Sequence, residues 1–322
     1  MGMQPTGEEI FAMQRLLWIL CCLLFGSTSP AIGKTLNGFD VSGSLVNERE
    51  IMQGGPPRDG IPAIDQPRYL AADETDYLKD DDLVLGLVHN GIAKAYPTRV
   101  LVWHEIVNAE FGSEPVVISF CPLCGSGLAF SAQHEGRRLD FGVSGLLYNS
   151  DLLMYDRQTE SLWSQIPGKA VTGPLAGTIL ERLPVTHLTW AEWKKRHPGS
   201  LVLSKNTGFH RDYSRTPYVG YEKSERLYFP VSKRDTRYSS KTWVLALEHN
   251  GQARAWPFPE LARTDGSVTD SFAGDKVVIH YNHEQQTAFA VDSEGRTLPA
   301  VRAYWFAWYG FYPFTEVYEA AN

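Results

Sequence analysis

Two apolar runs on either side of an Asn-Gly pair mark the segment VLGLVHNGIAKAYP at residues 84–97. Asn-Gly is typical of the two-residue turn that joins antiparallel strands, because both residues tolerate positive φ. The same pattern returns as VLALEHNGQARAWP at residues 244–257. We therefore predict two β-hairpins, with Asn90 and Asn250 at their turns.

A second pair of segments extends the likeness between these two parts of the chain. FGSEPVVISF at residues 111–120 matches FAGDKVVIHY at residues 272–281, and both have the pattern of buried strands. Such self-similarity indicates a duplicated structural unit. We predict a first copy near residues 55–135 and a second near 224–295. The chain is then a mainly β protein of the β-rich α+β class, with a duplicated hairpin-containing unit and a few short helices.

Helical signals are short and local. The clearest is THLTWAEWKKRHPG, where Thr189 has the position of an N-cap and Glu192 that of its capping-box partner. Pro198 ends this helix. A helix start is also predicted at Thr98, directly after the first hairpin.

The chain divides by composition into four predicted parts. These are a signal peptide (1–33), an N-terminal extension (34–53), a first β-rich unit (54–200), and a second β-rich unit with an aromatic tail (201–322). In the first part, an apolar run at 16–25 follows Arg15, and a small-residue cleavage site follows it. The run is too short to span a bilayer, so we expect an exported protein, periplasmic or extracellular, with no membrane span in the mature chain.

The charge distribution narrows the possible partners. The net charge is −7 over 322 residues, and no run of Lys and Arg builds a basic patch. Nucleic acid is therefore not expected as a partner. A small-molecule or protein partner stays open.

The segment CPLCG at residues 121–125 carries the chemistry that matters most, because the other cysteines leave with the signal peptide. Two cysteines in an exported protein ordinarily form a disulfide. A CxxC pair also serves in redox proteins, although here strand-like residues follow it instead of the helix that would stabilise a thiolate. A third possibility is a metal-binding knuckle, for which Pro122 and Gly125 favour the required tight turn.

A metal site built on CPLCG needs further ligands, because the chain has no second CxxC. Thiolates combined with histidine, methionine or carboxylate point to copper or zinc. The predicted ligands are Cys121, Cys124, His104 and Met154. The acidic and basic side chains of Asp156, Arg157 and Glu160 are candidates for a polar surround that orients these ligands.

Aligning the two copies through their shared strand strengthens the functional interpretation of the cysteines. Cys121 falls opposite Asn282 and Cys124 opposite Gln285. His104 falls opposite Asp265. If the cysteines only formed a disulfide that stabilises the fold, the second copy would be expected to contain a disulfide of its own.

Several longer stretches resemble one protein family. They are DGIPAID, AYPTRVLVWHEIVN, CPLCGSGLAF, FGVSGLLYNSDLLMYDRQTESLWSQ and FAWYGFYPFTEVY, and they run from about residue 54 to the C-terminus. Together they are similar to the bacterial and archaeal family catalogued as domain of unknown function 3179. The resemblance implies an exported protein, and it implies no activity, substrate, cofactor or catalytic residue.

Function must therefore be argued from the site. The hypothesis we carry forward is a transition-metal protein that uses the CPLCG knuckle. Two alternatives stay open. One is an extracytoplasmic thiol-disulfide oxidoreductase using Cys121 and Cys124. The other is a non-catalytic binding module in which the cysteines form a structural disulfide and the aromatic tail at 304–318 meets a partner.

Overall fold

Antiparallel pairing of short strands dominates the structure, a computed structural model that describes residues 1–2 and 33–321. Strands account for 40% of the described residues and helices for 8%, which confirms a mainly β protein. The chain from Thr35 onward forms one compact unit. The predicted signal peptide falls almost wholly on residues outside the described part. No helix among the described residues is long and apolar enough to cross a membrane.

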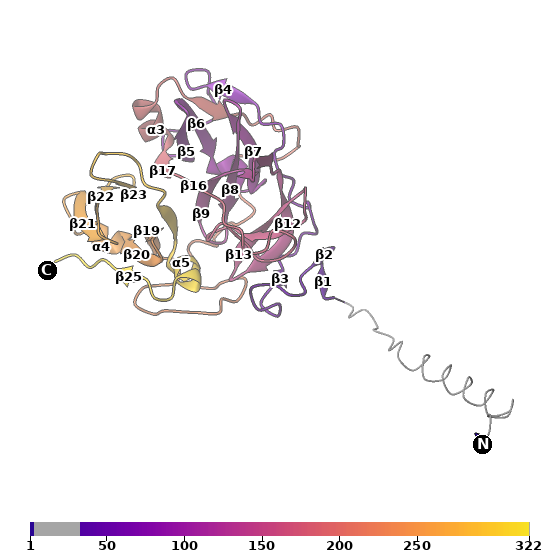
Figure 1. Cartoon of the computed structure of the whole chain (residues 1–322). Helices are drawn as coiled ribbons and strands as arrows, with labels where there is room; N and C mark the ends of the chain where they lie inside the picture. The colour runs from indigo at the N-terminus through magenta and orange to yellow at the C-terminus, as the bar shows by residue number, and fades with distance from the viewer. Residues whose placement is uncertain (3–32, 322) are drawn as a thin grey trace. The chain divides into compact units, whose positions relative to one another are not determined.

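Eight strands form the largest sheet (Figure 1). In spatial order they are β21 (Ser267–Phe272), β22 (Asp275–Asn282), β23 (Thr287–Val291), β17 (Val185–Thr189), β5 (Leu83–His89), β6 (Ile92–Pro97), β18 (Leu201–Leu203) and β4 (Tyr69–Ala71). β17 joins the two predicted β-rich units, because it pairs with β5 along its whole length and with β23 at His187. The boundary at residue 200 stays a prediction.

Three smaller sheets complete the main framework. A five-stranded sheet has the order β15 (Lys169–Ala170), β14 (Leu162–Ser164), β13 (Asp151–Asp156), β12 (Phe141–Tyr148) and β3 (Met52–Gln53). One four-stranded sheet has the order β16 (Arg182–Leu183), β9 (Ser126–Ser131), β8 (Glu114–Cys121) and β7 (Ile106–Phe111). The other has the order β24 (Val301–Tyr304), β19 (Trp243–His249), β20 (Gln252–Pro257) and β25 (Glu316–Val317).

The remaining elements are small. Two ribbons pair β1 (Thr35–Leu36) with β2 (Phe39–Asp40), and β10 (Gln133–His134) with β11 (Arg137–Arg138). The helices are α2 (Thr98–Leu101), α3 (Trp190–Arg196), α4 (Phe258–Leu261) and α5 (Trp305–Phe311). The predicted capping box of α3 is confirmed: the Thr189 hydroxyl accepts from the backbone N–H of Glu192, and the Glu192 carboxylate accepts from that of Thr189.

Both predicted hairpins are present with their Asn-Gly pairs at the turns. Asn90 has φ 50° and Asn250 has φ 52°, which are values that asparagine tolerates better than most residues. The registers agree as well: His89 pairs with Ile92 in β5–β6, and His249 with Gln252 in β19–β20.

The same order of elements occurs twice along the chain. β5, β6, α2, β7, β8 and β9 are followed by β17, α3 and β18, and β19, β20, α4, β21, β22 and β23 are followed by β24, α5 and β25. In each case the later strand lies antiparallel to the first hairpin strand, and the last one lies parallel to the second. That this order reflects a duplication stays a prediction.

The largest apolar cluster lies where elements from distant parts of the chain meet. It includes Val117 of β8, Leu128 of β9, Met154 of β13, Val301 of β24 and Trp308 of α5. β8 is buried on both faces for nearly its whole length, whereas β22 alternates buried and partly exposed positions over its second half. The CPLCG segment begins at the end of β8 and therefore starts inside the core.

Candidate metal centre

The turn that holds the two cysteines connects β8 to β9. β8 ends at Cys121 and β9 begins at Ser126, which pairs with Cys121 across the hairpin. Within the turn, the backbone N–H of Cys124 donates to the carbonyl of Cys121 at 3.2 Å. Both cysteine side chains are thereby held on one compact loop, as the knuckle interpretation requires.

Gly125 makes this loop possible. Its φ of 64° lies in the left-handed region, and a Cβ at this position would lie 2.4 Å from the Trp243 ring and 3.3 Å from Tyr304. A hydrogen bond also holds the loop: the carbonyl of Cys124 accepts from the backbone N–H of Tyr304 at 2.8 Å. The loop is packed and hydrogen-bonded against β19 and β24, so its geometry is set by the tertiary structure.

A third potential ligand, Asp151, reaches the cysteines from the hairpin of β12 and β13. Asn149 and Ser150 form its two-residue turn with φ values of 53° and 62°, and Tyr148 pairs with Asp151. Positive φ at two consecutive non-glycine residues is strained and persists only where surrounding contacts hold it. Here the Asn149 side chain donates to the carbonyl of Gly310 and accepts from the N–H of Ser232.

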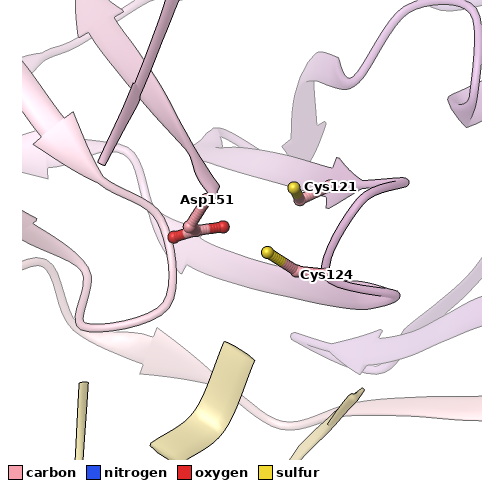
Figure 2. A group of neighbouring side chains, drawn as sticks. All are labelled: Cys121, Cys124 and Asp151. Carbon is pink, nitrogen blue, oxygen red and sulfur yellow. The ribbon is translucent and has the colours of Figure 1, made fainter. Parts of the chain in front are cut away.

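The three side chains form one buried group (Figure 2). One sulfur from each cysteine and one carboxylate oxygen of Asp151 all lie within 4.8 Å of one another. Both cysteines are free thiols, and no disulfide joins them. The thiol of Cys124 contacts the carbonyl of Ser150 at 3.4 Å. Three donors of this kind at this separation could hold one metal ion.

The Asp151 carboxylate is only half satisfied. One oxygen accepts from the backbone N–H of Ile166 at 3.0 Å. The other is buried and has no hydrogen-bond partner within the described residues. A buried acceptor without a partner is costly in an apolar core. A cation bound to this oxygen would remove that cost.

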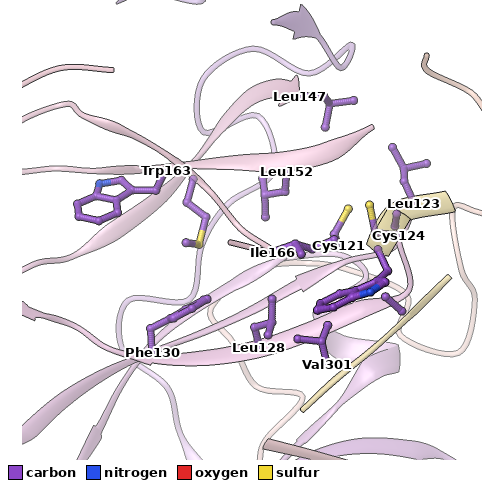
Figure 3. Packing of buried hydrophobic residues seen from close by; sticks show 14 of the residues in the cluster. Cys121, Leu123, Cys124, Leu128, Phe130, Leu147, Leu152, Trp163, Ile166 and Val301 are labelled. Atoms are coloured by element: carbon purple, nitrogen blue, oxygen red, sulfur yellow. The ribbon is translucent and has the colours of Figure 1, made fainter. Parts of the chain in front are cut away.

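The surroundings of the group are apolar (Figure 3). Leu123, Leu128, Leu152, Ile166 and Val301 belong to the same cluster as the cysteines. Such burial raises the pKa of Cys121, raises that of Cys124 further, and raises the pKa of Asp151 to about 7. At neutral pH the thiols therefore keep their protons unless a cation lies among them, because a metal ion removes the cost of burying the thiolate.

Glu105 is a further buried carboxyl group beside the centre. Burial raises its pKa to about 8, and its charge interacts with those of Cys121 and Asp151. Its backbone has φ 58°, and its carboxylate accepts from the Tyr218 hydroxyl at 3.5 Å. Close to neutral pH this group is poised to give or take a proton.

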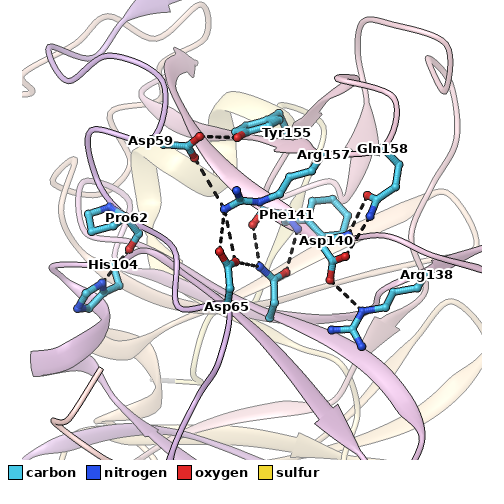
Figure 4. Close-up of polar contacts among 11 residues, drawn as sticks. Asp59, Pro62, Asp65, His104, Arg138, Asp140, Phe141, Tyr155, Arg157 and Gln158 are labelled. Carbon is cyan, nitrogen blue, oxygen red and sulfur yellow. Dashed lines mark hydrogen bonds and ion pairs between the residues drawn. The ribbon is translucent and has the colours of Figure 1, made fainter. Parts of the chain in front are cut away.

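His104 was expected to complete the site, and the structure does not bring it into the group. Its Nδ1 lies 2.7 Å from the carbonyl of Pro62 (Figure 4). Its Nε2 lies 2.7 Å from the hydroxyl of Tyr213. Both ring nitrogens are thus engaged elsewhere, and burial lowers the pKa of the imidazole. The third potential ligand that the structure brings to the cysteines is Asp151, and the role of His104 as a ligand stays a prediction.

Met154 lies in the same apolar cluster as the cysteines and is fully buried. It sits in β13, where it pairs with Val143 and Trp163. Because it comes three residues after Asp151 along the strand, its Cα is roughly 10 Å from that of the carboxylate residue. It packs in the core, and its role as a ligand stays a prediction.

The acidic and basic residues expected around the metal make their contacts elsewhere. Asp156 accepts from the backbone and hydroxyl of Thr159 and from the indole of Trp163. Arg157 pairs with Asp65 at 3.2 Å, as Figure 4 shows. Glu160 pairs with Arg58 at 2.8 Å, and both are substantially exposed. The structure therefore does not bring these three side chains to the cysteines.

The residues that sequence reasoning missed, Asp151 and Glu105, had weak but usable signals. Asp151 directly follows a turn and opens an otherwise apolar strand, LLMY, where a carboxylate is out of place. Glu105 adjoins His104 within VLVWHEIV at residues 100–107, a stretch that is otherwise apolar. A charged residue in such a context is a candidate for chemistry rather than for solvation.

Comparison with known proteins identifies one family over most of the chain. A family model described as "Protein of unknown function (DUF3179)" matches residues 58–315. No curated protein and no solved structure matches the chain.

Proposed function

The chain belongs to the DUF3179 family, and from that premise we propose that it is a metal-binding protein whose ion is held by Cys121, Cys124 and Asp151. The observation that carries the proposal is the buried, unpartnered oxygen of Asp151 beside two free, buried sulfurs. A cation between them would satisfy that oxygen and would compensate the charge of both thiolates.

The donor set favours zinc. Zinc accepts thiolate, imidazole and carboxylate in one tetrahedral site, whereas copper(I) prefers softer donors than a carboxylate oxygen. Oxygen-preferring ions such as magnesium and calcium are disfavoured by the two sulfurs. Copper is the main competitor, and the experiment below distinguishes the two.

Three protein ligands leave one coordination position for water or a substrate, which is the pattern of catalytic rather than structural zinc sites. Glu105 supports such a use, because it is a buried carboxyl group beside the cysteines, and a carboxyl group in such a place can exchange a proton with a metal-bound molecule. We assign Glu105 this proton-exchanging role and assign no particular reaction.

The two alternatives have less support. A thiol oxidoreductase needs an accessible thiolate, but both sulfurs are buried and their pKa values are raised by that burial. A binding module that uses the aromatic tail needs exposed rings, but Trp305, Phe306 and Trp308 are buried. Only Phe314 of that segment is strongly exposed, at 95%.

Two broader expectations belong to this proposal. We infer that the protein is exported, on the strength of the apolar run and cleavage site in residues 1–33. We also infer that the two halves arose by duplication, for which the repeated order of elements gives support. Only the first half would then hold the metal.

Metal titration of the purified protein tests the site. We expect one zinc ion per chain, and on the order of 100-fold weaker binding in Cys121→Ser, Cys124→Ser and Asp151→Asn, because each removes a direct ligand. Gln285→Ser, at the position corresponding to Cys124, is the matched control and should bind normally. Cobalt substitution should give sulfur-to-metal absorption bands that both cysteine variants weaken.

Some results would overturn the proposal. Equal zinc affinity in wild type and Asp151→Asn would remove the carboxylate from the site. Tighter binding of copper(I) than of zinc, unaffected by Asp151→Asn, would replace zinc by copper held by the sulfurs alone. No binding of either ion would leave the thiol oxidoreductase and the non-catalytic binding module as the remaining possibilities.

A further inference from the structure

A cavity of about 230 Å³ lies beside the metal-binding loop. Pro122 and Gly125 of the loop form part of its wall, and Trp243, Arg302 and Tyr304 form another part. Phe120, Tyr218 and Tyr221 add further aromatic surface. Drug-sized ligands occupy roughly 300–1,000 Å³, so this cavity suits a smaller molecule.

Arg302 is the unusual member of this wall. Only 6% of the residue is exposed, yet no hydrogen bond or ion pair to its guanidinium is found among residues 33–321, and its Nε is buried without a partner. Its Cζ lies 3.7 Å from the centroid of the Trp243 ring. Burial lowers its pKa to about 10, so the group is still charged at neutral pH.

A comparison with Arg254 shows what is missing around Arg302. Arg254 is also largely buried, and although its Nε, like that of Arg302, makes no hydrogen bond to a described residue, its guanidinium forms ion pairs with Asp270 at 2.9 Å and with Glu316 at 3.0 Å. Among the described residues, the one carboxylate whose charge raises the pKa of Arg302 is that of Glu222. Glu222 is an exposed residue that lines the cavity, and it forms no ion pair with Arg302. A buried guanidinium normally binds a carboxylate or phosphate through two N–H groups. Arg302 therefore offers the cavity a cationic group that could bind an anion.

The other walls decide what kind of anion fits. Trp243 and Tyr304 lie with their ring centroids 4.1 Å apart, and Phe120 is also buried nearby. Aromatic walls of this kind favour a ligand with an apolar body over a fully hydrated inorganic anion. The cavity therefore combines one cationic contact with an apolar enclosure.

The same walls reach the metal centre. Pro122 and Gly125 of the cavity wall directly follow Cys121 and Cys124 in the chain. Tyr218 donates from its hydroxyl to Glu105, and the buried hydroxyl of Tyr221 has no hydrogen-bond partner within the described residues. A molecule in the cavity would thus lie against the loop that carries two of the proposed metal ligands.

We propose that this cavity binds a small organic carboxylate with an apolar or aromatic body, its carboxylate at Arg302 and its body against Trp243 and Tyr304. Binding of the carboxylate at Arg302 does not require the metal ion. Only the idea that this molecule serves the metal centre rests on the proposed function.

Calorimetric titration of the full chain with benzoate tests this assignment. We expect saturable binding, with benzamide and inorganic phosphate binding at least about tenfold more weakly, because each lacks either the charge or the apolar body. Arg302→Met should weaken benzoate binding at least about tenfold through loss of the charge-assisted hydrogen bonds, and Arg302→Lys should weaken it less. The control is Arg296→Met, an exposed arginine that pairs with Asp292 and Glu294.

A second variant guards against misfolding of Arg302→Met. Thr216 is exposed and lines the cavity, so Thr216→Trp should fill the entrance and block benzoate while leaving Arg302 in place. Absence of benzoate binding, or equal binding in wild type and both variants, would refute the proposal. Cys121→Ser separates the two hypotheses: it should lose zinc and still bind benzoate.

Discussion

The two halves of this protein share a scaffold and differ in chemistry. β8 ends at Cys121 and the loop after it contains Cys124 and Gly125, whereas β22 ends at Asn282 and the loop after it contains Gln285 and Gln286. In the second loop, the Asn282 side chain accepts from the backbone N–H groups of Glu284 and Gln285, both at 3.0 Å. A polar side chain therefore organises that turn without sulfur. Because the same scaffold closes this loop without cysteines, the cysteines of the first half are best explained by what they bind.

A second difference explains why the second half lacks a third ligand. In the first half, residues 132–184 separate β9 from β17 and include the β12–β13 hairpin that carries Asp151. In the second half, only residues 292–300 separate β23 from β24. The proposed metal group thus depends on both the CPLCG loop and the β12–β13 hairpin, and the interval between β23 and β24 is too short to contain a second such hairpin.

The largest effect on stability is expected from Gly125→Ala. The added Cβ would meet Trp243 and would occupy a left-handed backbone position, which together cost about 2–5 kcal/mol. The corresponding change, Gln286→Ala, should alter stability by less than about 0.5 kcal/mol, since that residue already has φ 49° and is exposed. Urea denaturation of both variants measures the contrast. Equal losses would mean that the loop is not held more tightly in the first half.

A smaller effect concerns acid stability. His187 faces Leu85 across the β17–β5 pair, as Arg302 faces Leu245 across β24–β19. Burial, with a contribution from the charge of Arg302, lowers the pKa of His187 from 6.5 to about 3. The unfolded chain therefore takes up the proton first, so stability is complete above pH 6.5 and is lost as the pH falls towards 3.

At pH 5 this loss amounts to about 2 kcal/mol. The measurement is denaturant unfolding of wild type and His187→Gln between pH 7 and 4. The variant should lose less stability on acidification than the wild type. Parallel pH profiles for the two proteins would show that His187 does not control this part of the acid response.

The smallest effect is expected where the halves are most alike. His89 pairs with Glu114 at 2.9 Å and His249 with Asp275 at 3.3 Å, each linking a hairpin turn to the next. Such partly exposed pairs contribute little, so His89→Ala and His249→Ala should each change stability by about 0.5 kcal/mol or less and leave zinc binding intact. Loss of zinc binding in His89→Ala but not in His249→Ala would contradict the prediction that these two histidines play equivalent structural roles.

Local patterns in the sequence were sufficient for much of the fold. The two Asn-Gly hairpins and the Thr189–Glu192 capping box were predictable because each depends on residues close together in the chain. The pairing of β17 with both β5 and β23 was not, since no local signal specifies which distant strands meet. The aromatic tail was recognisable, and the structure buries its tryptophans in α5.

The site could be predicted only in part for the same reason. The CPLCG turn is local, so both cysteines and the role of Gly125 could be inferred from sequence. Asp151 reaches them through tertiary packing of the β12–β13 hairpin, which spacing cannot reveal. His104 was singled out because it disappears together with the cysteines in the second copy, but Pro62 and Tyr213 contact its two ring nitrogens.

The hydrogen bond from Tyr304 to Cys124 has a consequence for how the protein is made. All three proposed ligands precede β14 in the chain, yet the loop that carries Cys124 is anchored by Tyr304 of β24, which is synthesised much later. A nascent or truncated chain that lacks β24 therefore contains the ligands without the hydrogen bond that fixes their loop. We expect stable metal loading to follow the docking of β24, which makes occupancy of the centre a marker that this late strand has taken its place.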